Sequence, residues 1–454
     1  MTVEGLTINS LKKKDLLTLG FMMFSIYFGA GNLIFPPALG QAAGDHTLHA
    51  MLGFMTTGIG LPLLGITAIA LAGGEYVPLL HAKTWPRFAT VLLVILYLII
   101  GPLFAMPRTG AVSFEIGIRP FLSADNLALG QIIYTAVFFA SSYYLALNPN
   151  KIIDRVGRML TPALLIVLLI LFVQAFHAPL GAILPATGAY IDAPFAQGFQ
   201  DGYQTMDLLA SIAIGALVAN AVRMRGITDS RAVGAACLVS GLITVMLMAA
   251  VYGSLAYIGA TSTSVLGQAE NGGQILSAAV GIFFGSAGNL LLAVIIGLAC
   301  LTTCCGITSS AAMFFNKLLK GRVSYERLLL FSIMFSFAAS NVGLTQIIAL
   351  AIPFLVTIYP LIIVFVILSL FDRFIGWRKS IYQGAMTLTL VFSLIDGLHA
   401  AGLSSEPVHA LLVAYIPFYN IMMGWVCPAV TGALVGLAVS FFQTAPAAAK
   451  ESHV

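Results

Sequence analysis

Charged side chains are scarce in this chain, and their scarcity excludes most soluble architectures. Only 8% of the 454 residues are Asp, Glu, Lys or Arg, whereas 59% are hydrophobic. A water-soluble globule of this length has too little interior to hide so much apolar surface. The solvent of the fold is therefore predicted to be lipid, where about 20 residues of helix cross a hydrocarbon core of roughly 30 Å.

Patterns typical of enzymes, metal sites and nucleic-acid binding are missing as well. The sequence contains no H-E-x-x-H and no G-x-S-x-G, and the segments between its apolar runs are short. Basic and aromatic residues are not interleaved in a patch, so the net charge of +4 does not indicate nucleic acid as a partner. The five cysteines lie in apolar stretches, as small core residues do. We expect no enzyme, no cofactor and no obligatory protein partner.

Twelve apolar runs are expected to cross the membrane, which predicts a single-domain, all-α polytopic membrane protein. Their approximate boundaries are 16–40, 48–73, 87–118, 128–148, 158–178, 194–222, 232–259, 274–316, 325–341, 343–371, 381–403 and 408–442. The third run is expected to tilt or kink at Pro102 and Pro107. The eighth has room for a short surface helix before the span proper.

The distribution of Lys and Arg predicts the topology, because these residues concentrate in cytoplasmic loops. With the amino terminus inside and the spans alternating, all but two of the 21 basic residues fall on the cytoplasmic side. The exceptions are Arg108, within a span, and Arg119, outside. A miscounted helix would reverse every later loop, so the bias predicts an even count with both termini in the cytoplasm. The first apolar run is too long for a removable signal peptide and is expected to stay.

The first span contains an unusual run, S-I-Y-F-G-A-G-N-L-I-F-P-P, at residues 25–37. Gly29 and Gly31 each lower helix propensity by about 1 kcal/mol, and Pro36 and Pro37 remove two backbone donors, so a break is expected. Within lipid a break is tolerated only where the freed polar groups face a cavity or an ion. The run, with Asn32, therefore favours a functional break, and close helix packing with proline kinking is the alternative.

The sixth span opens with G-Y-Q-T-M-D-L-L-A-S-I-A-I-G, residues 202–215. Asp207 would be a carboxylate at membrane depth, and so costly a group indicates a functional site; a helix cap at the outer surface is the alternative. Because this element lies five spans after the first break, the spacing fits a five-plus-five inverted repeat with discontinuous helices 1 and 6. The repeats would cover about 15–178 and 194–371, with additional helices over about 381–442.

Two further patterns involve polar groups inside spans. Thr302 and Thr303, in A-C-L-T-T-C-C-G at 299–306, could complete an oxygen cage around a small hard cation, or merely bond to the carbonyl one turn earlier. Arg108 and Glu115 are seven residues apart and share one helical face. We interpret them as possible gate or ion-path residues, with a structural ion pair as the alternative.

Four segments together resemble the bacterial branched-chain amino acid:cation symporters, the BrnQ-type system II carriers. They are LLTLGFMMFSIYFGAGNLIFPPALGQAAG, GPLFAMPRTGAVSFE, GYQTMDLLASIAIG and ACLTTCCGITSS. The resemblance covers essentially the whole chain. The family is placed in the amino acid–polyamine–cation superfamily, whose fold resembles that of LeuT, a sodium-coupled amino acid transporter.

The resemblance implies a secondary active transporter of the bacterial plasma membrane that carries leucine, isoleucine or valine inward with sodium. The implied substrate contacts are Tyr27, Phe28, Gly29, Ala30, Gly31, Asn32, Asp207, Leu209 and Ser211. The sixth-span break is placed between Leu209 and Gly215. The implied sodium ligands are the carbonyls of Ser25, Phe28 and Ala299 and the hydroxyls of Thr302 and Thr303.

Other readings stay open. They are a proton-coupled carrier of other small neutral amino acids, and a channel or nutrient sensor. In some proton-coupled relatives of this fold a lysine from the fifth helix takes the place of sodium. The fifth span here, Met159 to Ala178, contains neither Lys nor Arg, which favours sodium.

Overall fold

Every regular element is a helix in the part of the chain that the computed structural model describes, residues 12–74, 76–147, 149–227, 229–372, 376, 378–404 and 406–442. Side chains are described for the same residues except 149–161, 406 and 408. A helix provides hydrogen-bond partners for its own backbone groups. Lipid provides none, so long apolar runs in a membrane fold as helices. The prediction of an all-α membrane fold is confirmed. Residues 1–11 and 443–454, whose cytoplasmic placement is a prediction, lie outside the described ranges.

The first five expected spans contain eight α-helices and two π-helical segments. These elements are α1 (Lys13–Tyr27) and α2 (Ala30–Ala43); α3 (Thr47–Met55), the π-helical η3 (Thr56–Gly60) and α4 (Leu61–Leu71); α6 (Pro86–Leu98), the π-helical η4 (Ile99–Leu103) and α7 (Ala105–Gly117); α8 (Leu127–Ala146); and α9 (Pro149–His177). A short helix that the sequence did not indicate, α5 (Tyr76–Lys83), links the second and third spans.

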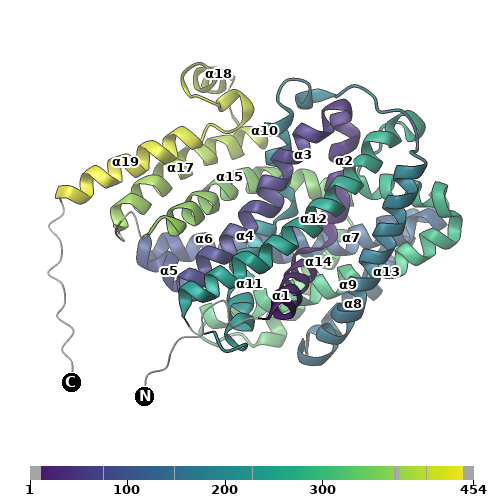
Figure 1. The fold of residues 1–454 in the computed structure, drawn as a ribbon, viewed down its shortest axis with the longest axis horizontal. Helices are drawn as coiled ribbons and strands as arrows, with labels where there is room; N and C mark the ends of the chain where they lie inside the picture. The colour runs from purple at the N-terminus through teal and green to yellow at the C-terminus, as the bar shows by residue number, and fades with distance from the viewer. Residues whose placement is uncertain are drawn as a thin grey trace.

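The remaining spans follow in the same order. They are α10 (Pro194–Asp201), the 3-10 turn η8 (Gly202–Thr205) and α11 (Asp207–Arg223); α12 (Ser230–Leu266); α13 (Gly272–Leu318); α14 (Tyr325–Ser340); α15 (Leu344–Leu370); and the added helices α17 (Lys379–Ala400), α18 (Glu406–Tyr415) and α19 (Val426–Phe442). In Figure 1, α15, α17 and α19 lie side by side along one flank, and α18 stands apart from them.

Helix packing follows the expected pseudo-symmetry. The two helices of the first span pack on α12 of the seventh, and the two helices of the sixth pack on α3 and α4 of the second. In the same way α7 contacts α14 and α15, whereas α13 contacts α8 and α9. Exchanging each span for the one five positions away maps these contacts onto one another, as a five-plus-five repeat requires. The repeat boundaries at 15–178 and 194–371 stay a prediction.

The number of spans is only partly resolved by helix length. Among the described residues, seven helical stretches are long and apolar enough to cross a membrane, or eight if the bent pair α10 and α11 counts as one span. Two shorter apolar helices, Pro162–His177 and Val426–Phe442, fall below that length. Interruptions shorten several helices, so twelve spans remain a prediction.

Irregular backbone lies at partly different places from those expected. The third span is helical through Pro107, and its distortion is at Gly101, which has φ −94° and ψ −124° beside Pro102. The eighth span does begin with a separate helical piece, because Gly285 (φ 64°) kinks α13. The single span expected at 408–442 is wrong. Pro417 follows the end of α18, and the chain turns through Phe418 and Met422 at positive φ before α19 begins.

Two glycines bring the first and seventh spans into backbone contact. A Cβ atom at Gly40 of α2 would lie 1.9 Å from the carbonyl oxygen of Ala256, and one at Gly259 of α12 would lie 2.0 Å from that of Pro37. Small residues permit such close approach between helices in lipid. The approach places side chains of α12 within reach of the first-span break, which matters for the site described below.

A buried ion pair joins α5 to the end of α15. The Lys83 ammonium donates to both carboxylate oxygens of Asp372 at 2.7 and 2.8 Å, and Tyr382 of α17 donates to Asp372 at 2.9 Å. Burial lowers the pKa of Lys83, and the bond to Asp372 works in the opposite direction. The pair thus ties the linker between the second and third spans to the added helices.

Replacing Lys83 with methionine is expected to lower the thermal denaturation temperature of the purified protein. It leaves the Asp372 carboxylate buried without a cation, at a cost of about 3–5 kcal/mol. The double variant Lys83→Met with Asp372→Leu should recover most of the loss, and Lys317→Met, at an exposed lysine, should have no effect. A double variant no more stable than Lys83→Met would contradict a dominant role for the unpaired charge.

Candidate functional site

The first span is interrupted where the glycines predict. α1 ends at Tyr27, Phe28 and Gly29 are extended (Gly29 φ −124°, ψ −167°), and α2 begins at Ala30. The carbonyls of Ile26 and Tyr27 at the end of α1 and the first amides of α2 therefore have no partners within their helices. The Gly29 amide donates to the side-chain oxygen of Asn32 at 3.4 Å. Phe28, Gly29 and the first turn of α2 are buried, so the freed groups lie inside the protein.

The sixth span is interrupted earlier than expected. The chain bends by 47° at Met206, which has a left-handed backbone (φ 62°), and α11 starts at Asp207. The predicted break between Leu209 and Gly215 is wrong, because α11 is regular there. The Ser211 hydroxyl bonds to the Leu208 carbonyl at 2.6 Å, and a Cβ at Gly215 would lie 2.6 Å from Ile69, so that glycine serves packing on α4.

Asp207 connects the two interruptions. Its carboxylate accepts a hydrogen bond from the Asn32 amide at 2.8 Å, and Tyr252 of α12 donates to the same oxygen at 3.5 Å. Tyr252 and Asn32 also contact each other directly. Asp207 is 4% exposed, so the surface-cap alternative is wrong. Three polar side chains from three spans thus meet, and one of them is a buried carboxylate.

Arg108 reaches the same place from α7. Its guanidinium donates to the carbonyl of Gln204 at 2.5 Å and to that of Thr205 at 3.4 Å, both in the turn η8. It lies over the Phe35 ring, 5.2 Å from the centroid, and is 5% exposed. A cation thereby satisfies carbonyls that the sixth-span break leaves without helical partners. The site holds one buried arginine and one buried aspartate.

Glu115 does not share this position. It lies at the other end of α7, where it accepts hydrogen bonds from Arg119 at 2.6 Å, Gln274 at 2.9 Å and Asn271 at 3.2 Å. These bonds fix the start of α13 against the end of α7. The structure therefore places Arg108 between the two breaks and Glu115 in a separate polar cluster, with no direct ion pair between them.

The two threonines among the candidate sodium ligands differ in their surroundings. Thr303 contacts the first break, and Thr302 makes a local hydrogen bond. A Cβ at Gly29 would lie 3.4 Å from the methyl and 3.6 Å from the hydroxyl of Thr303, so Thr303 of α13 faces the break. Thr302 donates to the carbonyl of Ala299 at 2.9 Å, which is the local bond weighed as the alternative. A hydroxyl that donates its proton keeps oxygen lone pairs for a cation. Ser25 is half-buried in α1, three residues before Phe28.

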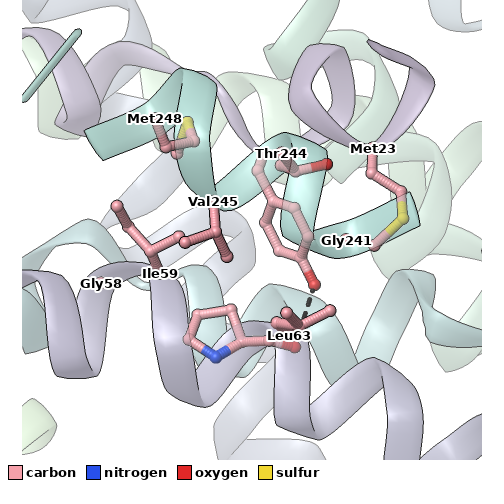
Figure 2. A pocket seen from close by; sticks show the side chains of 10 residues that line it. Met23, Gly58, Ile59, Leu63, Gly241, Thr244, Val245 and Met248 are labelled. Atoms are coloured by element: carbon pink, nitrogen blue, oxygen red, sulfur yellow. Dashed lines mark hydrogen bonds between the residues drawn. The ribbon is translucent and has the colours of Figure 1, made fainter. Parts of the chain in front are cut away.

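Three of the expected substrate contacts have side chains that pack within the protein, and their role in binding stays a prediction. Tyr27 lines a small apolar cavity between α1, α4 and α12, and its hydroxyl donates to the Pro62 carbonyl at 3.4 Å. Figure 2 shows this cavity, with Met23, Leu63 and Thr244 around it. Leu209 is fully buried in the apolar core. Ser211 faces α4, because a Cβ at Gly65 would lie 2.4 Å from its hydroxyl. These residues support the helices that carry the breaks.

Sequence reasoning missed several members of the site. Tyr252 is one of two tyrosines in the long apolar helix α12, and nothing in its spacing indicates a partner 220 positions away. The carbonyls of Gln204 and Thr205 could be recognised as hydrogen-bond acceptors of the site only after the break was located at Met206. Arg108 was recognised as an intramembrane charge, but its position between the breaks depends on tertiary packing.

Comparison with known proteins gives consistent matches over the whole chain. The family model described as "Branched-chain amino acid transport protein" matches residues 12–443. The branched-chain amino acid permease BraB of Bacillus subtilis is 46% identical over 434 residues, covering 96% of this chain and 97% of that protein. The branched-chain amino acid transport system 2 carrier protein of Pseudomonas aeruginosa is 44% identical, covering 92% and 94%. The permease BrnQ of Escherichia coli is 38% identical, covering 96% and 98%.

Solved structures match in fold. Mhp1, a nucleobase-cation-symport-1 family transporter in a closed conformation with bromovinylhydantoin bound, gives a TM-score of 0.56 at 14% identity, covering 94% of this chain and 92% of that one. The manganese transporter of Eremococcus coleocola gives 0.57 at 15% identity, covering 94% and 96%. At such identities the likeness concerns the fold alone. With the two interrupted spans, it confirms the predicted LeuT-like fold class.

Proposed function

This chain belongs to the family of branched-chain amino acid transport proteins, and from that membership we propose that it imports leucine, isoleucine or valine together with sodium, by alternating access. It is a multi-pass membrane transport protein, and the relatives reported above are named permeases and carriers, not enzymes. We place it in the bacterial plasma membrane, with both termini in the cytoplasm.

The observation that carries the proposal is the meeting of both interruptions at Asp207. The Asn32–Asp207 bond joins the start of α2 to the start of α11, with backbone amides and carbonyls freed on either side. Half-helix amino ends favour a carboxylate, and carbonyl ends favour an ammonium or a metal cation. The polar part of an amino acid therefore fits between the breaks, and its aliphatic side chain fits the apolar surroundings.

Sodium is the proposed coupling ion. The Thr303 hydroxyl faces Gly29, directly after the end of α1, and neutral oxygens of this kind are the ligands that a small hard cation prefers. Residues 159–178 of the fifth span contain no Lys or Arg that would supply a cation of the protein's own. The proposed ligands remain Ser25, Phe28, Ala299, Thr302 and Thr303.

Alternating access requires two groups of helices that move relative to each other, and the helix contacts divide the protein into two groups. The interrupted spans pack on α3, α4 and α12, which form one group, and α7, α8, α13 and α14 contact one another as a second group. Mhp1 has been solved in closed and inward-facing conformations, which shows that its fold permits such a change in that protein. Here we propose that the first group rocks against the second around Asp207.

Leucine uptake by purified protein in proteoliposomes tests the proposal. An inward sodium gradient at equal pH should drive saturable accumulation of leucine, and a pH gradient without sodium should not. Non-saturable flux would favour a channel. Uptake that follows the pH gradient and ignores sodium would overturn sodium coupling and would favour a proton-coupled carrier, with Asp207 and Glu115 as candidate proton carriers.

The substitution Asp207→Asn is expected to reduce uptake by at least roughly tenfold, about 1.4 kcal/mol. The carboxylate accepts from Asn32 and Tyr252, and an amide removes the charge from a site built around it. Initial rates at fixed sodium and pH provide the measurement. Asp192→Asn, in an exposed loop, is the control. If Asp207→Asn left the rate and the sodium dependence unchanged, its proposed role would be wrong.

A further inference from the structure

Two of the three guanidinium nitrogens of Arg108 donate hydrogen bonds within the protein, and the third does not. Its two bonds, from Nη1 to the Gln204 carbonyl and from Nη2 to the Thr205 carbonyl, hold the side chain against η8. Nε is buried and has no hydrogen-bond partner among the described residues. A buried donor without a partner is costly, so this atom calls for an acceptor that the protein does not supply.

The Nη2 nitrogen of the guanidinium lies against the start of α2. A Cβ at Gly31 would lie 2.9 Å from Nη2 and 3.2 Å from Cζ, so any larger residue at position 31 would force the guanidinium to shift. The first amides of α2, a helix of 14 residues, have no partners within that helix. Two independent sets of donors therefore converge, one from the helix start and one from a buried arginine.

We propose that Arg108 is the specificity-determining residue for the substrate's carboxylate, which it receives in a bidentate pair through Nε and Nη2 together with the first amides of α2. This inference rests on the proposed function. Planar bidentate pairing is the geometry in which arginine binds carboxylates most strongly. The contact with the Phe35 ring and the bonds to η8 fix the plane of the guanidinium in advance.

Asp207 completes the recognition of a zwitterion. The carbonyls that bind Arg108 precede Asp207 by three and two residues, so the cation and the anion flank the same break. The ammonium of an α-amino acid pairs with Asp207, and its carboxylate pairs with Arg108. An aliphatic amine leaves the guanidinium without a partner, and a fatty acid leaves Asp207 without one. A buried unpaired charge is strongly unfavourable, so the pair selects α-amino acids over either single ion.

Binding of leucine, L-leucinol and 4-methylpentanoate to purified protein tests the assignment. Leucinol keeps the ammonium and lacks the carboxylate, whereas 4-methylpentanoate keeps the carboxylate and lacks the ammonium. In Arg108→Gln, leucine and 4-methylpentanoate should each lose about a hundredfold in affinity, and leucinol should lose nothing. The preference for leucine over leucinol should therefore collapse by the same factor. Arg119→Gln, in the 3-10 turn η5 (Arg119–Phe121) that follows α7 and outside the site, should retain the wild-type profile.

An equal loss for leucine and leucinol in Arg108→Gln would overturn the proposal, because it would show that Arg108 only holds η8 in place. If Arg108→Gln does not fold, Gly31→Ala provides the same test. Its Cβ displaces the guanidinium edge, so the expected loss again affects leucine and spares leucinol. Failure of the proposed function would look different, since wild-type protein would then show no saturable leucine binding.

Discussion

The substitution Gly31→Leu is expected to abolish leucine binding and uptake while leaving the protein in the membrane. Even a Cβ at this position would lie 2.9 Å from the Arg108 guanidinium and 3.2 Å from the Phe35 ring. A leucine side chain must therefore displace the arginine or fill the space between the two interruptions. Leucine also favours helix over glycine by about 1 kcal/mol, which promotes a continuous first span. We expect affinity to fall by at least roughly a hundredfold.

Equilibrium binding of radiolabelled leucine, with the amount of protein in the membrane measured by immunoblotting, provides the readout. Gly306→Leu is a matched control, because the position lies in the eighth span and a Cβ there meets nothing within 4 Å. It should bind leucine normally. If Gly31→Leu transported leucine with near-normal affinity, the substrate would not lie at the first-span break.

Replacing Thr302 and Thr303 with valine should remove the sodium dependence of leucine affinity with little loss of fold. Valine has nearly the shape of threonine, and the exchange substitutes two methyl groups for two hydroxyls. Thr303 faces Gly29, and the Thr302 oxygen keeps its lone pairs while donating to Ala299. Without these oxygens the cage cannot replace the hydration shell of sodium. Leucine affinity measured over a range of sodium concentrations at fixed pH gives the result.

Thr308→Val is the control for this pair. Thr308 lies on the same helix and bonds to the Cys304 carbonyl at 2.6 Å, away from the first-span break. It should keep the wild-type sodium dependence. Unchanged sodium dependence in the Thr302→Val and Thr303→Val double variant would remove these hydroxyls from the ion site.

The first break could be located from sequence because its cause is local. Gly29 and Gly31 weaken the helix and a proline pair follows, and the backbone leaves helical geometry at Phe28 and Gly29. The sixth-span break has no such cause. It lies at Met206, a residue type with no preference for left-handed backbone, while the nearby Gly215 packs against Ile69 inside a regular helix. The placement between Leu209 and Gly215, which was implied by the resemblance, was therefore several residues too late in the chain.

The residues of the site were likewise predictable from the sequence only in part. Asp207 stood out because a carboxylate in an apolar span is costly, and it proved to be buried at the break. Its partners could not be predicted, because Asn32 and Tyr252 reach it across 175 and 45 residues of chain through close packing of α2 on α12. Arg108 and Glu115 share a helix, and only tertiary contacts show that one joins the breaks and the other does not.

Reciprocal linkage between leucine and sodium tests the central claim most directly. If both bind at the first-span break, sodium raises leucine affinity by some factor at fixed pH, and leucine must raise sodium affinity by the same factor. Titration of the purified protein with each ligand, at several fixed concentrations of the other, measures both. The account predicts equal factors greater than one. A leucine affinity that is independent of sodium and changes with pH would contradict it.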